Sequence, residues 1–166
     1  PITLHKVLGL GAKNAAVVLA GADLDAAAAA LVKGALGFNG QRCTAEKIVF
    51  VQRAVADALV QRLAARVAAL RVGMPWDDGV AITPLPEPGK LAQMRALLDD
   101  ALAQGARVHN AGGGRGTHSL MRPALVYPVT AGMRLAHEEQ FGPILAVARF
   151  DEVAEVLQWQ RRSPYG

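Results

Sequence analysis

The chain has one cysteine, Cys43, among its 166 residues. A single thiol cannot form an internal disulfide, so the sequence excludes the class of small secreted domains that disulfides hold together. No run reaches the roughly 18 uncharged apolar residues of a membrane-spanning helix. The first residues, Pro1 to Lys6, lack the basic start, apolar centre and small-residue cleavage site of a signal peptide. These absences predict a soluble, cytoplasmic protein without a membrane partner.

Several familiar site patterns are also absent. Neither Ser-x-x-Lys nor Gly-x-Ser-x-Gly occurs. The net charge is +4, but the arginines are scattered and aromatic residues make up only 5%, so nucleic-acid binding is not expected. A small anionic substrate or cofactor is compatible with this charge. We expect no bound metal, because metal-ligand spacing is absent among the histidines. The four histidines are His5, His109, His118 and His137.

The sequence does contain enough apolar residues, 52%, for one domain with a sizeable core. Asp23 is a suitable N-cap for an alanine-rich helix that ends near Leu36. Apolar residues at every third or fourth position predict a second helix from Val55 to Leu70. Strands alternate with helices, which predicts an α/β fold with a mostly parallel sheet flanked by helices. The expected strands are 4–10, 15–19, 47–52, 107–110, 123–127 and 144–150, and the other helical segments are 90–104, 133–139 and 152–161.

Cys43 lies where the alanine-rich helix gives way to a predicted strand. Gly37 and Gly40 precede it, and Arg42 is its neighbour. One interpretation is a small buried hydrophobic residue, which is common for a lone cysteine. The other is a nucleophile, because free backbone N–H groups of the turn and the charge of Arg42 would favour the thiolate. The local sequence leaves both open.

A second candidate is the stretch from Glu138 to Pro143, which reads Glu-Glu-Gln-Phe-Gly-Pro. Paired acids before such a turn are compatible with a solvated helix end. The pattern alone favours that interpretation. The alternative is a carboxylate that holds ribose hydroxyls, with Phe141 as an apolar wall.

The glycine-rich stretch from Gly112 to Gly116 is a weaker candidate. Its backbone N–H groups have the composition of a phosphate-binding loop. It lacks the lysine of a P-loop, and no helical pattern follows it, so we interpret it as a solvated loop.

Taken in order, these stretches resemble the aldehyde dehydrogenase superfamily, over essentially the whole chain. The context of Cys43, with Arg42 and Thr44, is most similar to the non-phosphorylating, NADP-dependent glyceraldehyde-3-phosphate branch. The matching stretches are Lys13-Asn14, Ala22-Asp23-Leu24-Asp25, Gly40-Gln41-Arg42-Cys43-Thr44-Ala45, Val72-Gly73-Met74-Pro75, Ile82-Thr83-Pro84-Leu85, Glu138 to Pro143 and Pro164-Tyr165-Gly166.

The resemblance implies a reaction and roles for particular residues. Cys43 would attack an aldehyde carbon, and its own backbone N–H would be one arm of an oxyanion hole. Glu139 would hold the ribose of NADP or NAD, and Phe141 would pack near the nicotinamide ring. Arg42 would face the phosphate of a phosphorylated aldehyde.

The sequence also departs from the family. The family's general base is a glutamate that opens the motif Glu-Leu-Gly-Gly-Lys, whereas the aligned stretch here opens with Gly9, and no acid occurs from Pro1 to Ala22. A missing base typically costs about 10²–10⁴ in rate. An alternative is therefore an inactive relic or interaction module that keeps the fold.

The resemblance further implies that residues 1–166 form an incomplete catalytic domain, without the cofactor domain and the C-terminal oligomerisation segment. The catalytic domain of the family packs against its cofactor domain. We therefore expect an exposed apolar surface here, and either a separate cofactor-domain chain or a second copy as the partner.

Overall fold

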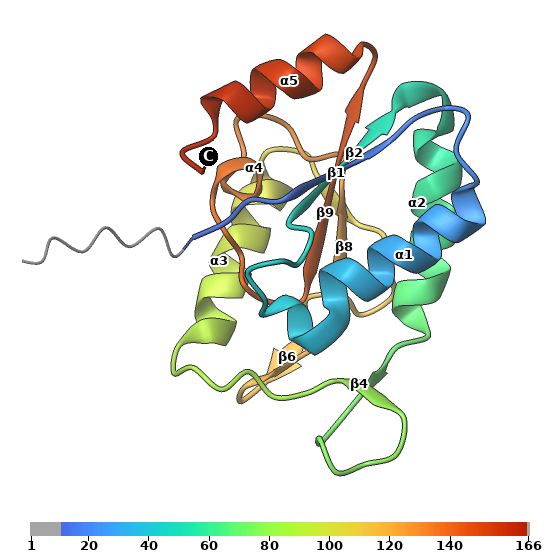
Figure 1. Cartoon of the computed structure of the whole chain (residues 1–166). Coiled ribbons are helices and arrows are strands. Elements are labelled where there is room, and N and C mark those ends of the chain that lie inside the picture. The colour runs from blue at the N-terminus through green and yellow to red at the C-terminus, as the bar shows by residue number, and fades with distance from the viewer. Residues whose placement is uncertain (1–10, 166) are drawn as a thin grey trace, which may run out of the picture.

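A computed structural model describes residues 11–165, so Gly9 and the strand predicted over 4–10 lie outside the described residues (Figure 1). At the centre is a five-stranded sheet in the order β1-β2-β9-β8-β5. The strands β1, β2, β9 and β8 run parallel to one another, and β5 is antiparallel to β8. The prediction of a mostly parallel sheet is therefore confirmed. The strands are β1 (Ala15–Val18), β2 (Ile48–Gln52), β5 (Arg107–Val108), β8 (Ala124–Tyr127) and β9 (Ile144–Phe150).

Helices cover both faces of the sheet, and the alternation of side chains along the strands explains the two layers (Figure 1). In β2, Val49 and Val51 point to one apolar core, whereas Ile48 and Phe50 point to the other. The core with Val49 is closed by α1 (Leu24–Leu36) and α2 (Arg53–Ala68). The core with Phe50 is closed by α3 (Lys90–Ala103), the single turn α4 (Arg134–His137) and α5 (Val153–Arg162).

The first helix begins and ends where its sequence predicts. The side chain of Asp23 accepts hydrogen bonds from the N–H groups of Asp25 and Ala26, which satisfies two of the donors at the helix start. The C-cap is Gly37, and the segment η1 (Gly37–Gly40) follows at once. This segment leads the chain from the helix into the turn that carries Cys43.

The stretch from Gly112 to Gly116 is a turn, but its glycines are partly buried, so it is not the fully solvated loop that we expected. It leads into β6 (Gly116–Thr117), which pairs in antiparallel fashion with β7 (Leu120–Met121). The glycines allow close packing against α3, because a Cβ at Gly114 would lie 2.6 Å from a methyl carbon of Leu98. A second short pair is formed by β3 (Arg71–Val72) and β4 (Val80–Ile82). The sequence indicates an extended piece over 81–85, which overlaps β4, but it does not indicate β3, since a two-residue strand carries almost no periodicity.

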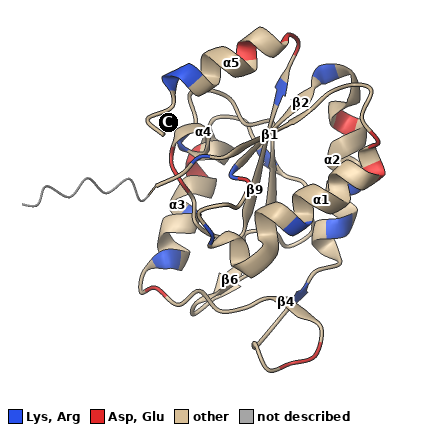
Figure 2. Cartoon of the chain, in the orientation of Figure 1, with Lys and Arg blue, Asp and Glu red and all other residues tan. Residues whose placement is uncertain are grey.

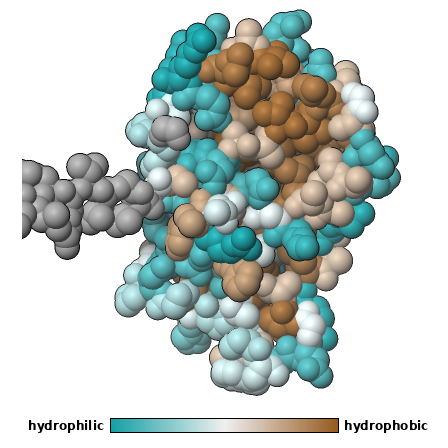
Figure 3. Space-filling view, in the orientation of Figure 1, coloured by the Kyte–Doolittle hydropathy of each residue, from teal (hydrophilic) through white to brown (hydrophobic). Residues whose placement is uncertain are grey.

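The surface combines scattered charge with one apolar region. Lysine, arginine and acidic residues are spread over the helices and loops without a dominant basic stripe in this view (Figure 2). Apolar atoms gather below α5 and over β1 (Figure 3). Exposed side chains of α5, of β1 and of the residue that follows β1 form what we call the β1–α5 apolar face, made up of Val17, Leu19, Val153 and Leu157. An exposed apolar surface, expected from the resemblance, is therefore present. Among the described residues no helix combines the length and the hydropathy needed to cross a membrane.

Candidate active site

The turn that carries Cys43 is open to solvent. Cys43 is exposed and lies between η1 and β2. Within η1, Phe38 and Asn39 both have positive φ angles, of 54° and 61°. The side chain of Asn39 holds this unusual backbone, because its amide oxygen accepts the N–H of Thr83 at 2.8 Å. The interpretation of Cys43 as a small buried residue is wrong.

The backbone of this turn is anchored from β1 and leaves donors free. Asn14 donates from its side-chain nitrogen to the carbonyl oxygens of Cys43 at 2.6 Å and Ala45 at 3.0 Å. Within residues 11–165, the N–H groups of Arg42, Cys43 and Thr44 have no acceptor. Free N–H groups beside a thiol are the donors that an oxyanion hole requires. No independent signal in the sequence indicates the anchoring role of Asn14, which is only the end of a matching stretch.

Arg42 extends along the surface of the same turn. Its guanidinium lies 5.2 Å from the centre of the Phe38 ring and donates to the hydroxyl oxygen of Thr44 at 3.2 Å. The side chain is exposed. A charged group in this position is accessible to an anionic ligand, and its role toward a substrate phosphate stays a prediction.

A close approach of two backbones joins the Cys43 turn to the second candidate stretch. Gly40 has a φ of +70°, and a Cβ at this position would lie 2.6 Å from the carbonyl oxygen of Gly142. Only glycine combines this conformation with this distance. Two stretches about 100 residues apart in the sequence therefore meet, as the resemblance implied.

The structure separates the two acids of the Glu-Glu pair. Glu138 is a surface residue bound by Arg134, whose guanidinium donates to its oxygens at 2.6 and 2.8 Å and lowers the pKa of that carboxyl. Glu139 points inward, where one oxygen accepts the N–H of Ala12 at 3.1 Å and the other lies 3.5 Å from the Lys47 ammonium. The solvated interpretation fits Glu138 and does not fit Glu139.

Three buried polar side chains surround Glu139, and we call Lys13, Lys47 and Gln140 the buried polar network. Lys13 donates to the carbonyl oxygen of Glu138 at 2.7 Å and to the side-chain oxygen of Gln140 at 2.8 Å. Gln140 donates to the carbonyl oxygens of Lys47 at 2.8 Å and Ile144 at 3.0 Å. Lys13 is 6% exposed, and Lys47 and Gln140 are each 1% exposed. Sequence reasoning assigned no role to Lys47 or Gln140.

Burial changes the protonation of both lysines. It lowers the pKa of the Lys13 ammonium to about 7, assisted by the positive charge of Lys47 and opposed by Glu139 and Glu138. Burial also lowers the pKa of the Lys47 ammonium, and the nearby Glu139 carboxylate opposes that shift. Two lysines in a nearly dry environment thus share one inward-facing carboxylate.

Phe141 forms an apolar surface next to this network. The Lys47 ammonium lies 4.8 Å and the Lys90 ammonium 5.4 Å from the centre of its ring. Its backbone has a φ of 39°, a conformation that is uncommon for an aromatic residue. The side chain is partly exposed, so one part of the ring remains accessible.

One oxygen of Glu139 lacks a hydrogen-bond donor among the described residues, and a ligand hydroxyl would suit it. Among the described residues, Oε1 is buried and has no hydrogen-bond donor, although it forms an ion pair with the Lys47 ammonium at 3.5 Å. A buried acceptor without a donor is costly, so a hydroxyl of a bound molecule would stabilise it. The ribose of a nicotinamide cofactor supplies such a hydroxyl, so the residues fit this group. No cluster of potential metal ligands occurs in residues 11–165.

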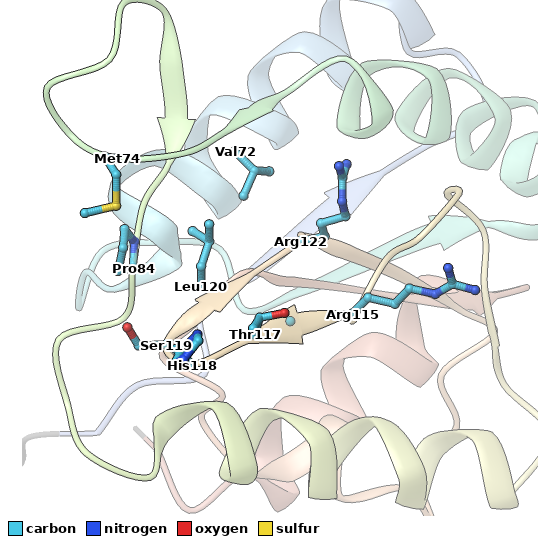
Figure 4. Close-up of a pocket in the computed structure, with 10 residues that line it drawn as sticks. Val72, Met74, Pro84, Arg115, Thr117, His118, Ser119, Leu120 and Arg122 are labelled. Atoms are coloured by element: carbon cyan, nitrogen blue, oxygen red, sulfur yellow. The ribbon is translucent and has the colours of Figure 1, made fainter.

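A hollow of about 610 Å³ lies elsewhere, between the β6–β7 hairpin and the segment around β3 and β4. Its lining includes Met74, Pro84 and His118 but none of Cys43, Glu139 or Phe141. Arg115 and Arg122 extend away from Met74 and Pro84 and do not converge on a common point (Figure 4). The hollow therefore does not bring charged groups together around one ligand.

Comparison with known proteins identifies the family. The family model described as the aldehyde dehydrogenase family matches residues 4–166. The NADP-dependent glyceraldehyde-3-phosphate dehydrogenase of Streptococcus equinus is 42% identical over 160 residues, which are 96% of this chain and 33% of that protein. A vanillin dehydrogenase of Pseudomonas sp. is 43% identical over 160 residues, again 96% of this chain and 33% of that protein.

The solved structures agree. The NADP-dependent glyceraldehyde-3-phosphate dehydrogenase of Bacillus halodurans, complexed with NADP, superimposes with a TM-score of 0.89 and 42% sequence identity, covering 95% of this chain and 32% of that one. The chain thus spans about a third of the length of these relatives. The fold, the ordered motifs and the family match lead to one conclusion: this chain belongs to the aldehyde dehydrogenase family.

Proposed function

We propose that residues 1–166 form the nucleophile-bearing part of the catalytic domain of an NADP-dependent aldehyde dehydrogenase. The observation that carries this proposal is the close approach of two stretches, one with an exposed thiol and free N–H groups beside it, the other with an inward-facing carboxylate that has an unpaired oxygen. Relatives with 42% identity that are NADP-dependent glyceraldehyde-3-phosphate dehydrogenases support NADP and that phosphorylated aldehyde as the first candidates.

In this proposal Cys43 performs the covalent step. Its sulfur attacks the aldehyde carbon to give a thiohemiacetal, and the backbone N–H of Cys43 stabilises the charge that develops on oxygen. NADP, when bound, supplies the two-electron acceptor that converts the thiohemiacetal to a thioester. Water then hydrolyses the thioester, releasing the acid and restoring the thiol.

The remaining predicted residues act in binding. Glu139 accepts a hydrogen bond from a ribose hydroxyl through its unpaired oxygen, and the accessible part of the Phe141 ring packs against the nicotinamide. Arg42, beside Cys43, binds the phosphate of the aldehyde, where its planar fork of donors suits an anion. The same contacts with Glu139 and Phe141 are available to NAD.

The rest of the site comes from outside the chain. Because the chain spans about a third of its relatives, we propose that the rest of the cleft is supplied by a cofactor domain, with the β1–α5 apolar face as one of the surfaces covered in the assembled cytoplasmic protein. A second copy of the chain is the other candidate for covering this face.

A chimeric enzyme tests the proposal. Residues 1–166 would replace the matching third of the Streptococcus equinus relative, and NADP reduction would be followed with glyceraldehyde 3-phosphate. We expect turnover, and a loss of about 10⁴-fold or more in the Cys43→Ala variant, because removing a nucleophile abolishes the covalent route. A folded chimera without any NADPH formation, even in the first turnover, would support the inactive relic instead.

Gly9 provides a sharper test of the missing base. If acylation proceeds without the base and hydrolysis does not, the chimera should release about one equivalent of NADPH in a burst followed by slow turnover. Gly9→Glu should then raise the steady-state rate by about 10²–10⁴-fold. Gly9→Gln is the matched control, since it adds the same volume without a proton acceptor and should leave the rate unchanged.

A further inference from the structure

Lys47 touches both halves of the site, although it belongs to neither motif. Its ammonium donates to the carbonyl oxygen of Gly40 at 2.8 Å, at the start of the turn that carries Cys43. The same ammonium lies 3.5 Å from Glu139 and 4.8 Å from the centre of the Phe141 ring. One cation thus contacts the nucleophile turn, the carboxylate and the apolar wall.

The backbone of Lys47 is fixed as firmly as its side chain. Its N–H donates to the carbonyl oxygen of Asn14 at 2.8 Å, and its carbonyl oxygen accepts from Gln140 at 2.8 Å. Asn14 in turn anchors the carbonyl oxygen of Cys43. The position of the ammonium relative to Cys43 and Glu139 is therefore set by β1, β2 and the stretch before β9 together.

Stability alone does not explain a lysine here. The side chain is 1% exposed and is followed by the apolar strand β2, so an uncharged side chain of similar length would avoid the cost of burying an ammonium. Buried charges that nevertheless persist gather at functional sites. The other charged groups close enough to affect Lys47 are Glu139, Lys90, Lys13 and Cys43 itself.

We propose that Lys47 is a positioning residue of the active site, which holds the Glu139 carboxylate ready for the cofactor ribose and places positive charge beneath the turn of the nucleophile. The inference deepens the proposed function and rests on it for the role of Glu139. The electrostatic effect on Cys43 is independent of cofactor and turnover. It can therefore be measured on the chain as it is.

The test is the pH profile of alkylation of Cys43, the only thiol in the chain, by iodoacetamide. The thiolate is the reacting form. Lys47→Met removes the nearby cation, so we expect the rate at neutral pH to fall about 3- to 10-fold and the profile to move to higher pH. Glu139→Gln removes the anion that partly neutralises the Lys47 ammonium, so we expect the rate to rise about 2-fold or more. Lys33→Met, an exposed lysine on α1, is the control and should change nothing.

The opposite signs separate electrostatics from misfolding. A disturbed fold would move both variants in the same direction, whereas the proposal requires one decrease and one increase. Equal rates in all variants, or changes of the same sign in Lys47→Met and Glu139→Gln, would overturn the role of Lys47. Failure of the chimera to turn over would count against the proposed function and would leave these alkylation rates unaffected.

Discussion

The Cys43 turn and the Glu139 corner lie side by side but are built in opposite ways. Next to Glu139, the side chains of the buried polar network, Lys13, Lys47 and Gln140, form hydrogen bonds of 2.7 to 3.0 Å with one another and with backbone carbonyl oxygens. Around Cys43, the side chains of Arg42, Cys43 and Thr44 are exposed, and the anchors are the two bonds from Asn14. The surroundings of Glu139 are therefore buried and held by hydrogen bonds, and we call them the locked side. The turn of Cys43 is exposed and has few hydrogen bonds, and we call it the open side.

This difference has a physical reason. Polar groups in a nearly dry interior must be paired, so a buried network has one low-energy arrangement and resists displacement. A nucleophile needs the opposite environment, with donors that remain free for charge that develops on the substrate.

Breaking the locked side should have the largest effect. Gln140→Leu removes three buried hydrogen bonds, one accepted from the Lys13 ammonium and two donated to the carbonyl oxygens of Lys47 and Ile144, so we expect the free energy of unfolding to fall by about 3 kcal/mol or more. The exposed Gln61 on α2 provides the control, Gln61→Leu, which should stay within about 0.5 kcal/mol of the parent. Urea denaturation measures both. Equal midpoints would mean that the network does not stabilise the corner.

The sequence predicted much of the scaffold and little of this locked corner. Local signals such as the Asp23 cap and the apolar spacing of Leu59 and Leu63 act within one or two helical turns, so they can be read directly. In the network next to Glu139, Gln140 bonds to Lys13, 127 positions away, and to Lys47, 93 positions away. The residues next to Lys47 in the sequence contain no pattern from which these partners could be predicted. The glycine-rich hairpin was missed for a similar reason, since glycines favour a loop until a distant helix packs on them.

A pH titration should show the cost of burying Lys13. The pKa of the Lys13 ammonium falls from 10.5 to about 7 on folding, so the unfolded chain binds more protons between these values and the free energy of unfolding rises with pH. We expect a rise of about 2 kcal/mol from about pH 7 to about pH 9, since one proton contributes up to about 1.4 kcal/mol per pH unit. Lys47 contributes in the same direction.

Lys13→Met isolates this contribution. The variant has no ammonium to deprotonate, so its unfolding free energy should rise with pH by roughly half as much as that of the parent chain or less. Lys33→Met, on the exposed side of α1, should keep the full rise. Urea denaturation at several pH values makes the comparison. A parent chain whose stability is flat or falls over this range would contradict the buried position of Lys13.

The smallest effect is expected on the open side, at Asn14. Asn14→Ala removes the two donated bonds to Cys43 and Ala45, and because the residue is exposed we expect a loss of only about 1 kcal/mol. Amide hydrogen exchange should accelerate in residues 41–45 and stay unchanged in residues 138–142, where the network is intact. Asn14→Asp sharpens the test: a carboxylate has the same shape but donates nothing, and it would face two carbonyl oxygens. This variant should be no more stable than Asn14→Ala, and parent-like stability would show that Asn14 does not anchor the turn by donating hydrogen bonds.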